Sequence, residues 1–146
     1  MFSSVMVLDL VVALLLGSMI IFAAVIAPSV FKLLEAEQAG IFLRGLFPRF
    51  YLWGAVMSVL ALLLSLWTSP ANILLVAIVL LGFVYSRQFL TKRINAARDR
   101  WLASDAANDK IAFDRLHKQS VMINLIQMFL LLVIIVFYFF RHTQDY

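Results

Sequence analysis

Long apolar runs alternate with short polar segments along the whole chain. A helix needs roughly 20 apolar residues to cross a hydrocarbon layer about 30 Å thick. Four runs approach or reach this length, at about residues 6–27, 51–67, 73–90 and 121–140. We therefore predict one all-α domain, residues 1–146, that crosses a membrane four times.

Prolines and glycines indicate where these runs should end. Pro28 is expected to end the first run, and Ser69-Pro70 the second, because proline disfavours helix in the residue before it. Between the two runs, a short amphipathic helix is expected to break at Gly40, with a further bend at Pro48. Only a short linker joins the second and third runs, which predicts an antiparallel pair.

Basic residues are distributed unevenly around the four runs. Of the twelve Lys and Arg residues, only Arg141 lies outside the two longer connections and their borders. The positive-inside rule then places both connections in the cytoplasm and both termini outside, as in a bacterial inner-membrane protein. This topology accounts for the net charge of +4, so we expect no nucleic-acid partner.

The composition excludes several kinds of function. Only 14% of the residues are charged, against roughly a quarter in soluble domains, so the lipid bilayer is the expected partner of the apolar surface. The absence of cysteine excludes disulfides, thiolate metal sites and thiol catalysis. No phosphate-binding loop, catalytic triad or histidine pair at metal-binding spacing stands out. We therefore expect no catalytic residues, no metal site and no cofactor.

Residues 91–120, between the third and fourth runs, contain neither proline nor glycine. Helix-forming residues on both sides of a polar turn at 104–108 predict a cytoplasmic helical hairpin that continues both runs. A tip near Ala106 sets one register for this hairpin. That register pairs Trp101 with Ile111, Arg98 with Asp114, Asn95 with His117, and Arg87 with Asn124.

Polar residues form a stripe where the fourth run begins. At about 100° per residue, one helix face carries His117, Ser120, Asn124 and Gln127. Arg87 and Asn95 lie on a similar stripe of the preceding helix, and polar groups are costly against lipid, so the two stripes should face each other. One interpretation is a polar vestibule open to the cytoplasm, in which Arg87 and His117 bind an anion or relay a proton. The other is a hydrogen-bonded seam that fixes the register of the helices.

Several short motifs occur in a fixed order along the chain. They are Ala27-Pro28-x-x-Phe31, Leu46-Phe47-Pro48, Arg93-x-Asn95 and His117-x-x-Ser120-x-x-x-Asn124. Together they resemble the transmembrane protein 205-like family, whose bacterial members are catalogued as a domain of unknown function. The resemblance spans nearly the whole chain and implies a four-helix membrane protein without an established catalytic activity. It also implies a role in export or trafficking, although a soft-metal cargo does not suit a chain without cysteine or a methionine array.

Three functions remain open from the sequence. The leading one is a non-enzymatic transport-related component or accessory subunit. Because four spans rarely enclose a translocation path, this function requires a homo-oligomer or a membrane-protein partner. The second is a haem-dependent membrane oxidoreductase that uses His117. The third is a scaffold that docks a partner through the hairpin.

Overall fold

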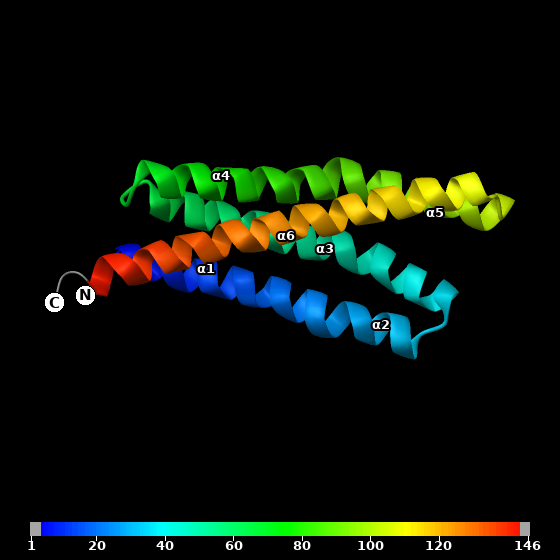
Figure 1. Cartoon of the computed structure of the whole chain (residues 1–146), viewed down its shortest axis with the longest axis horizontal. Helices are drawn as coiled ribbons and strands as arrows, with labels where there is room; N and C mark the ends of the chain where they lie inside the picture. Colours follow the sequence, from blue (N-terminus) through cyan, green and yellow to red (C-terminus); the bar gives the residue numbers. More distant parts are fainter. Residues whose placement is uncertain (1–3, 144–146) are drawn as a thin grey trace.

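The computed structural model describes residues 4–143, without the side chains of residues 138 and 141–143. Within this range the chain is all-α and forms four helices that are long and apolar enough to cross a membrane (Figure 1). They are built, in chain order, from α1 (Ser4–Ile21), η1 (Phe22–Ile26) and α2 (Ala27–Leu33), then α3 (Ala36–Ser65), then α4 (Pro70–Tyr85), η2 (Ser86–Leu90) and α5 (Thr91–Ser104), and finally α6 (Ala107–Thr143). The all-α class and the four candidate spans are thus confirmed. The side chain of Arg141, which matters for the predicted orientation, lies outside the described residues.

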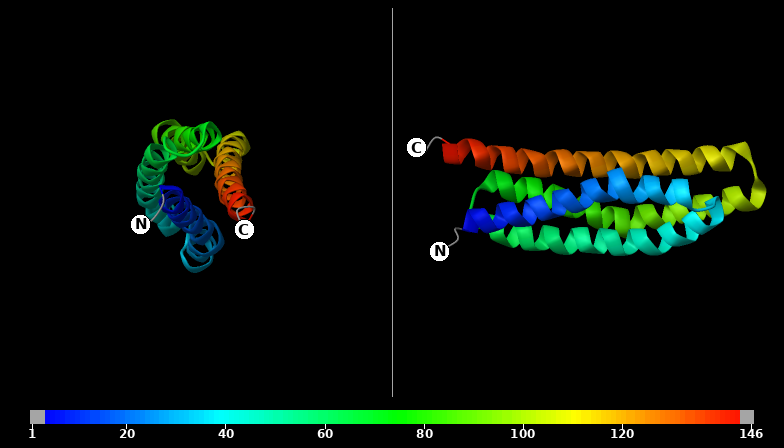
Figure 2. Two further views of the ribbon diagram at one scale, coloured as in Figure 1. Left: turned by 90° about the vertical axis from the view of Figure 1, so that its left-hand side faces the viewer. Right: turned by 90° about the horizontal axis from the view of Figure 1, so that it is seen from below.

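The four helices are arranged around a common axis when the bundle is viewed along its length (Figure 2). α3 packs against both α1 and α4, and α6 packs against α4 and α1 on the opposite side. The core between them is apolar and includes Leu8, Leu15, Phe83 and Ile134, each at most 1% exposed. Many large apolar side chains point outward instead, as expected of helices whose outer surface contacts lipid.

The first helix does not end at Pro28, contrary to the sequence-based prediction, but continues to Leu33. The π-helical turn η1 ends at Ile26, two residues before the proline, and the N–H of Ala27 donates to the carbonyl of Phe22, five residues earlier. A proline ring in a regular helix clashes with the carbonyl four residues before it, and a widened turn removes that constraint. The helix ends at Leu34 and Glu35, where the backbone is extended.

α3 runs through Gly40 and Pro48 without a break, so Gly40 does not end a helix as predicted. Gly40 instead lies directly beneath the guanidinium of Arg98 from α5, and a Cβ at this position would be 1.6 Å from its Nη2. The glycine therefore permits a close side-chain approach. The Pro48 carbonyl accepts a hydrogen bond from Nε of Arg87 at 3.3 Å.

A second π-helical turn, η2, joins α4 to α5. Its end is held by Thr91, whose N–H and hydroxyl both donate to the carbonyl of Ser86. α5 ends at Ser104, Asp105 takes a left-handed conformation with φ of 49°, and α6 begins at Ala107. α5 and α6 then pack against each other along their length.

Trp101 of α5 contacts two residues of α6, Lys110 and Phe113, which lie on either side of its predicted partner Ile111. The ring of Trp101 stacks on Phe113, with centroids 5.6 Å apart, whereas Ile111 is 57% exposed. Arg98 donates to the carbonyl of Ala36 at 2.8 Å. Asp114 accepts from Lys110 at 2.7 Å, one turn away on its own helix, which is a common arrangement for opposite charges.

Candidate functional site

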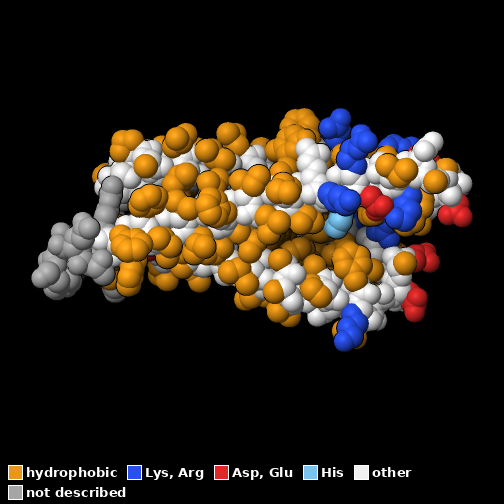
Figure 3. All heavy atoms as spheres, viewed as in Figure 1, with side chains coloured by type: hydrophobic (Ala, Val, Ile, Leu, Met, Phe, Trp, Pro, Cys, Tyr) orange, Lys and Arg blue, Asp and Glu red, His pale blue; other side chains and the backbone are white. Residues whose placement is uncertain are grey.

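A cavity of about 410 Å³ lies between α2 and α3 on one side and α5 and α6 on the other. Its lining is largely apolar and includes Leu43, Phe47 and Phe113. Figure 3 shows a hollow beside the pale-blue histidine, near the end of the molecule where basic side chains gather.

Three of the six predicted vestibule residues line this cavity: Asn95, His117 and Ser120. Asn95 comes from α5, and the other two come from neighbouring turns of α6. Because α5 and α6 are antiparallel neighbours, residues far apart in sequence reach the same space. The cavity is therefore lined by the part of each polar stripe that lies nearer the turn between α5 and α6.

The other three vestibule residues, Arg87, Asn124 and Gln127, do not line the cavity. Arg87 binds the carbonyl of Pro48. Gln127 is only 2% exposed, and its Nε2 donates to the carbonyl of Val79 in α4 at 2.9 Å. These contacts hold helices together, as in the seam interpretation.

Tyr51 closes the inner end of the cavity. Its hydroxyl lies 3.0 Å from Oγ of Ser120, and the side chain of Asn124 lies beside the same hydroxyl. The tyrosine ring also stacks on Phe47, with centroids 5.7 Å apart. Sequence reasoning missed this role, because a tyrosine at the start of an apolar run is equally typical of a membrane interface. Its position three residues after Pro48 in the Leu-Phe-Pro motif was the available signal.

Two arginines line the cavity closer to the turn between α5 and α6. Arg44 forms an ion pair with Asp99. Arg98 occupies its position over Gly40, and among the described residues no carboxylate forms an ion pair with it. Arg98 therefore contributes an uncompensated positive charge to the cavity.

His117 and Asn95 supply the polar groups that remain available to a ligand. The imidazole of His117 stacks on Phe113 with ring centroids 6.0 Å apart. Within residues 4–143, hydrogen-bond partners are recorded neither for its nitrogens nor for the amide of Asn95. Both side chains are half-buried and can each donate and accept a hydrogen bond.

The lining chemistry favours binding over metal chemistry. His117 is the only histidine among the lining residues, and the described part of the chain contains no group of three His, Cys, Asp or Glu side chains that could hold a metal ion. The cavity thus combines an apolar wall, two free hydrogen-bonding side chains and one unpaired cation. This combination can hold a molecule that has both an apolar part and a polar or anionic group.

A comparison with models of protein families finds a match for this chain. A family model described as a domain of unknown function, DUF4149, matches residues 10–101. This range extends from α1 to Trp101 in α5, so it contains much of the cavity lining but not α6. No curated protein and no solved structure matches the chain.

Proposed function

We propose that this chain, which belongs to the DUF4149 family, is a non-enzymatic membrane protein that binds a small molecule, as a transport-related component or accessory subunit. The cavity of about 410 Å³ carries this proposal. Small-molecule sites are typically concave and about 300–1,000 Å³ in volume, with mostly apolar walls and a few placed polar groups. Asn95 and His117 are such groups.

The distribution of Lys and Arg residues supports a membrane location and an orientation for the protein. We place the protein in a bacterial inner membrane with both termini outside and the α5–α6 turn in the cytoplasm, because of the strong bias of Lys and Arg toward that end. The cavity then opens on the cytoplasmic side. A transport role requires a homo-oligomer or a membrane-protein partner, and it agrees with the resemblance to the transmembrane protein 205-like family, which stays a prediction.

Native mass spectrometry of gently extracted protein tests the binding function. The wild-type chain should retain a small molecule, and the double variant Asn95→Ala/His117→Ala should retain at least about tenfold less, since two hydrogen bonds at roughly 1 kcal/mol each are lost. Lys118→Ala is the matched control, because Lys118 adjoins His117 in sequence but is exposed and does not line the cavity. A wild-type chain without a bound molecule would contradict the proposal, as would equal retention by the double variant.

A scaffold function is the second candidate. Leu102 and Ile111 lie near the α5–α6 turn and are 64% and 57% exposed, on helices that are otherwise polar there. The same native mass spectra would show a protein partner at fixed stoichiometry if this function holds. In the haem alternative, His117, the single imidazole of the cavity, would bind haem. An absorption spectrum of the extracted protein tests this alternative by showing whether haem is bound.

A further inference from the structure

The unpaired positive charge in the cavity belongs to Arg98, which has N–H groups left to bind a ligand. A guanidinium carries five N–H groups in a planar fork that suits phosphate oxygens. Among residues 4–143, Arg98 makes a single hydrogen bond, which its Nη2 donates to the carbonyl of Ala36. The neighbouring Arg44 is neutralised by Asp99. Arg98 is therefore the group in the lining best suited to an anion.

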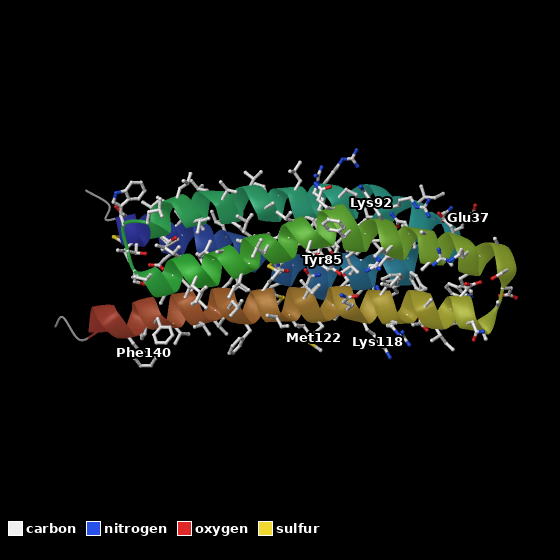
Figure 4. The ribbon with its side chains drawn as sticks, turned by 90° about the horizontal axis from the view of Figure 1, so that it is seen from above. Glu37, Tyr85, Lys92, Lys118, Met122 and Phe140 are labelled. Carbon is white, nitrogen blue, oxygen red and sulfur yellow. The ribbon has the colours of Figure 1, made fainter. Side chains whose placement is uncertain are left out.

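The cavity lies at the depth where lipid headgroups are expected. In Figure 4, Lys92 and Lys118 lie at one level along the bundle, with Tyr85 and Met122 toward its apolar end and Glu37 toward the charged end. The α5 side of the lining runs from Thr91 to Trp101, so it begins beside Lys92 and continues toward the charged end. Basic side chains at such a boundary attract anionic lipids.

One side of the cavity opens toward the surrounding bilayer. Among the described residues α2 packs against η1 and α3 but against neither α5 nor α6, and Figure 1 shows α2 diverging from α6. Phe31 of α2 lines the cavity and is nevertheless 61% exposed. Leu34, just beyond α2, also lines the cavity and is 36% exposed. A ligand can thus reach the cavity sideways while its hydrocarbon part stays in contact with apolar side chains.

We propose that the cavity binds the headgroup of an anionic phospholipid that enters laterally between α2 and α6. The phosphate lies against the guanidinium of Arg98, His117 and Asn95 bind the remaining headgroup oxygens, and the acyl chains leave past Phe31. The apolar wall favours a lipid over a free anion. This inference rests on the proposed binding function and names its ligand class.

Lipid titration of the purified full-length protein in detergent, followed by native mass spectrometry, tests this inference. Phosphatidylglycerol should bind at least about tenfold more tightly than phosphatidylcholine. Arg98→Gln should weaken phosphatidylglycerol binding by about tenfold or more, because charge-assisted hydrogen bonds are the strong ones. Arg93→Gln is the matched control, since it removes the same charge from the same helix at an exposed position outside the lining.

Gly40→Ala provides a second variant that keeps the net charge. Its new methyl group would overlap the guanidinium of Arg98, so it should reproduce the loss of phosphatidylglycerol binding. Thermal unfolding of each variant shows whether the protein still folds, and Arg98→Lys, which keeps the charge without the fork, should bind with intermediate affinity.

Three outcomes would overturn the inference. They are equal affinity for the two lipids, an equal loss of binding in Arg93→Gln, and competition by glycerol 3-phosphate at concentrations similar to those of the lipid, which would indicate a site for free anions. Each of these leaves the proposed binding function standing if a cavity ligand is still lost from the Asn95→Ala/His117→Ala variant. If the double variant instead keeps its ligand, the proposed binding function itself is contradicted.

Discussion

Three glycines of this bundle, Gly40, Gly54 and Gly82, lie beneath large side chains from other helices. A Cβ at Gly54 would be 2.3 Å from Cε1 of Phe83, and one at Gly40 would overlap the guanidinium of Arg98. The spacing of Gly54 and Ser58 predicts a helix face that allows close approach, and this face does pack against α4. The pattern identifies the face but not the ring that fills it, because the partner is set by how the helices are rotated.

Gly54→Ala should destabilise the protein. Phe83 is fully buried, so its ring has no space to move, and overpacking of this kind typically costs about 1–3 kcal/mol. This exceeds the gain of roughly 1 kcal/mol that alanine brings over glycine in a helix. The midpoint of thermal unfolding in detergent should therefore fall.

Gly17→Ala is the matched control for this substitution, because a Cβ at Gly17 would have no neighbour within 4 Å. Its unfolding midpoint should stay unchanged or rise. A similar rise in both alanine variants would show that the Phe83 ring does not constrain Gly54.

Helix boundaries show where sequence rules for single residues fail in this protein. Proline and glycine suggest breaks at Pro28 and Gly40, yet both positions are helical. The actual break at Leu34 and Glu35 contains neither residue, and the side chain of Glu35 makes no capping hydrogen bond. The two π-helical turns also lack a sequence signature, because a single widened turn depends on how the flanking helices pack and not on particular side chains.

Asp105 governs the turn between α5 and α6. It is the only non-glycine residue with positive φ among the described residues, a conformation that costs L-amino acids roughly 1–2 kcal/mol and that Asp tolerates better than most. Asp105→Gly should raise the free energy of unfolding by up to about 1 kcal/mol, and Asp105→Val should lower it by about 1–2 kcal/mol. Thermal unfolding of the two variants side by side checks this order, and a valine variant as stable as the glycine variant would contradict it.

At the scale of the whole molecule, apolar run length was sufficient to predict the four-helix bundle. The candidate site was predictable only in part. His117, Ser120, Asn124 and Gln127 share an arc of about 80° on α6. Ser120 and Gln127 nevertheless meet different helices, because Gln127 lies two turns farther along: Ser120 contacts Tyr51 of α3, and Gln127 contacts Val79 of α4. The cavity itself arises because α2 diverges from α6, and hydrophobic periodicity carries no information on that divergence.

The predicted orientation can be tested with single cysteines, since the chain has none of its own. Ala71→Cys and Ala103→Cys place matched thiols at exposed positions near opposite ends of the bundle. In intact cells with a permeabilised outer membrane, a membrane-impermeant maleimide should label the thiol at 71, and it should label the thiol at 103 only after lysis. The reverse pattern would place the α5–α6 turn outside and contradict the positive-inside assignment.

The two π-helical turns also bear on how such a protein can diversify. η1 and η2 directly precede α2 and α5, two of the segments that line the cavity. Each turn holds one residue more than a regular helical turn, so losing that residue would rotate the segment beyond it by about 100°. One-residue insertions and deletions can thus present new side chains to the cavity while α1 and α4 keep their packing. Evolution can in this way alter what the protein recognises without rebuilding the part that crosses the bilayer.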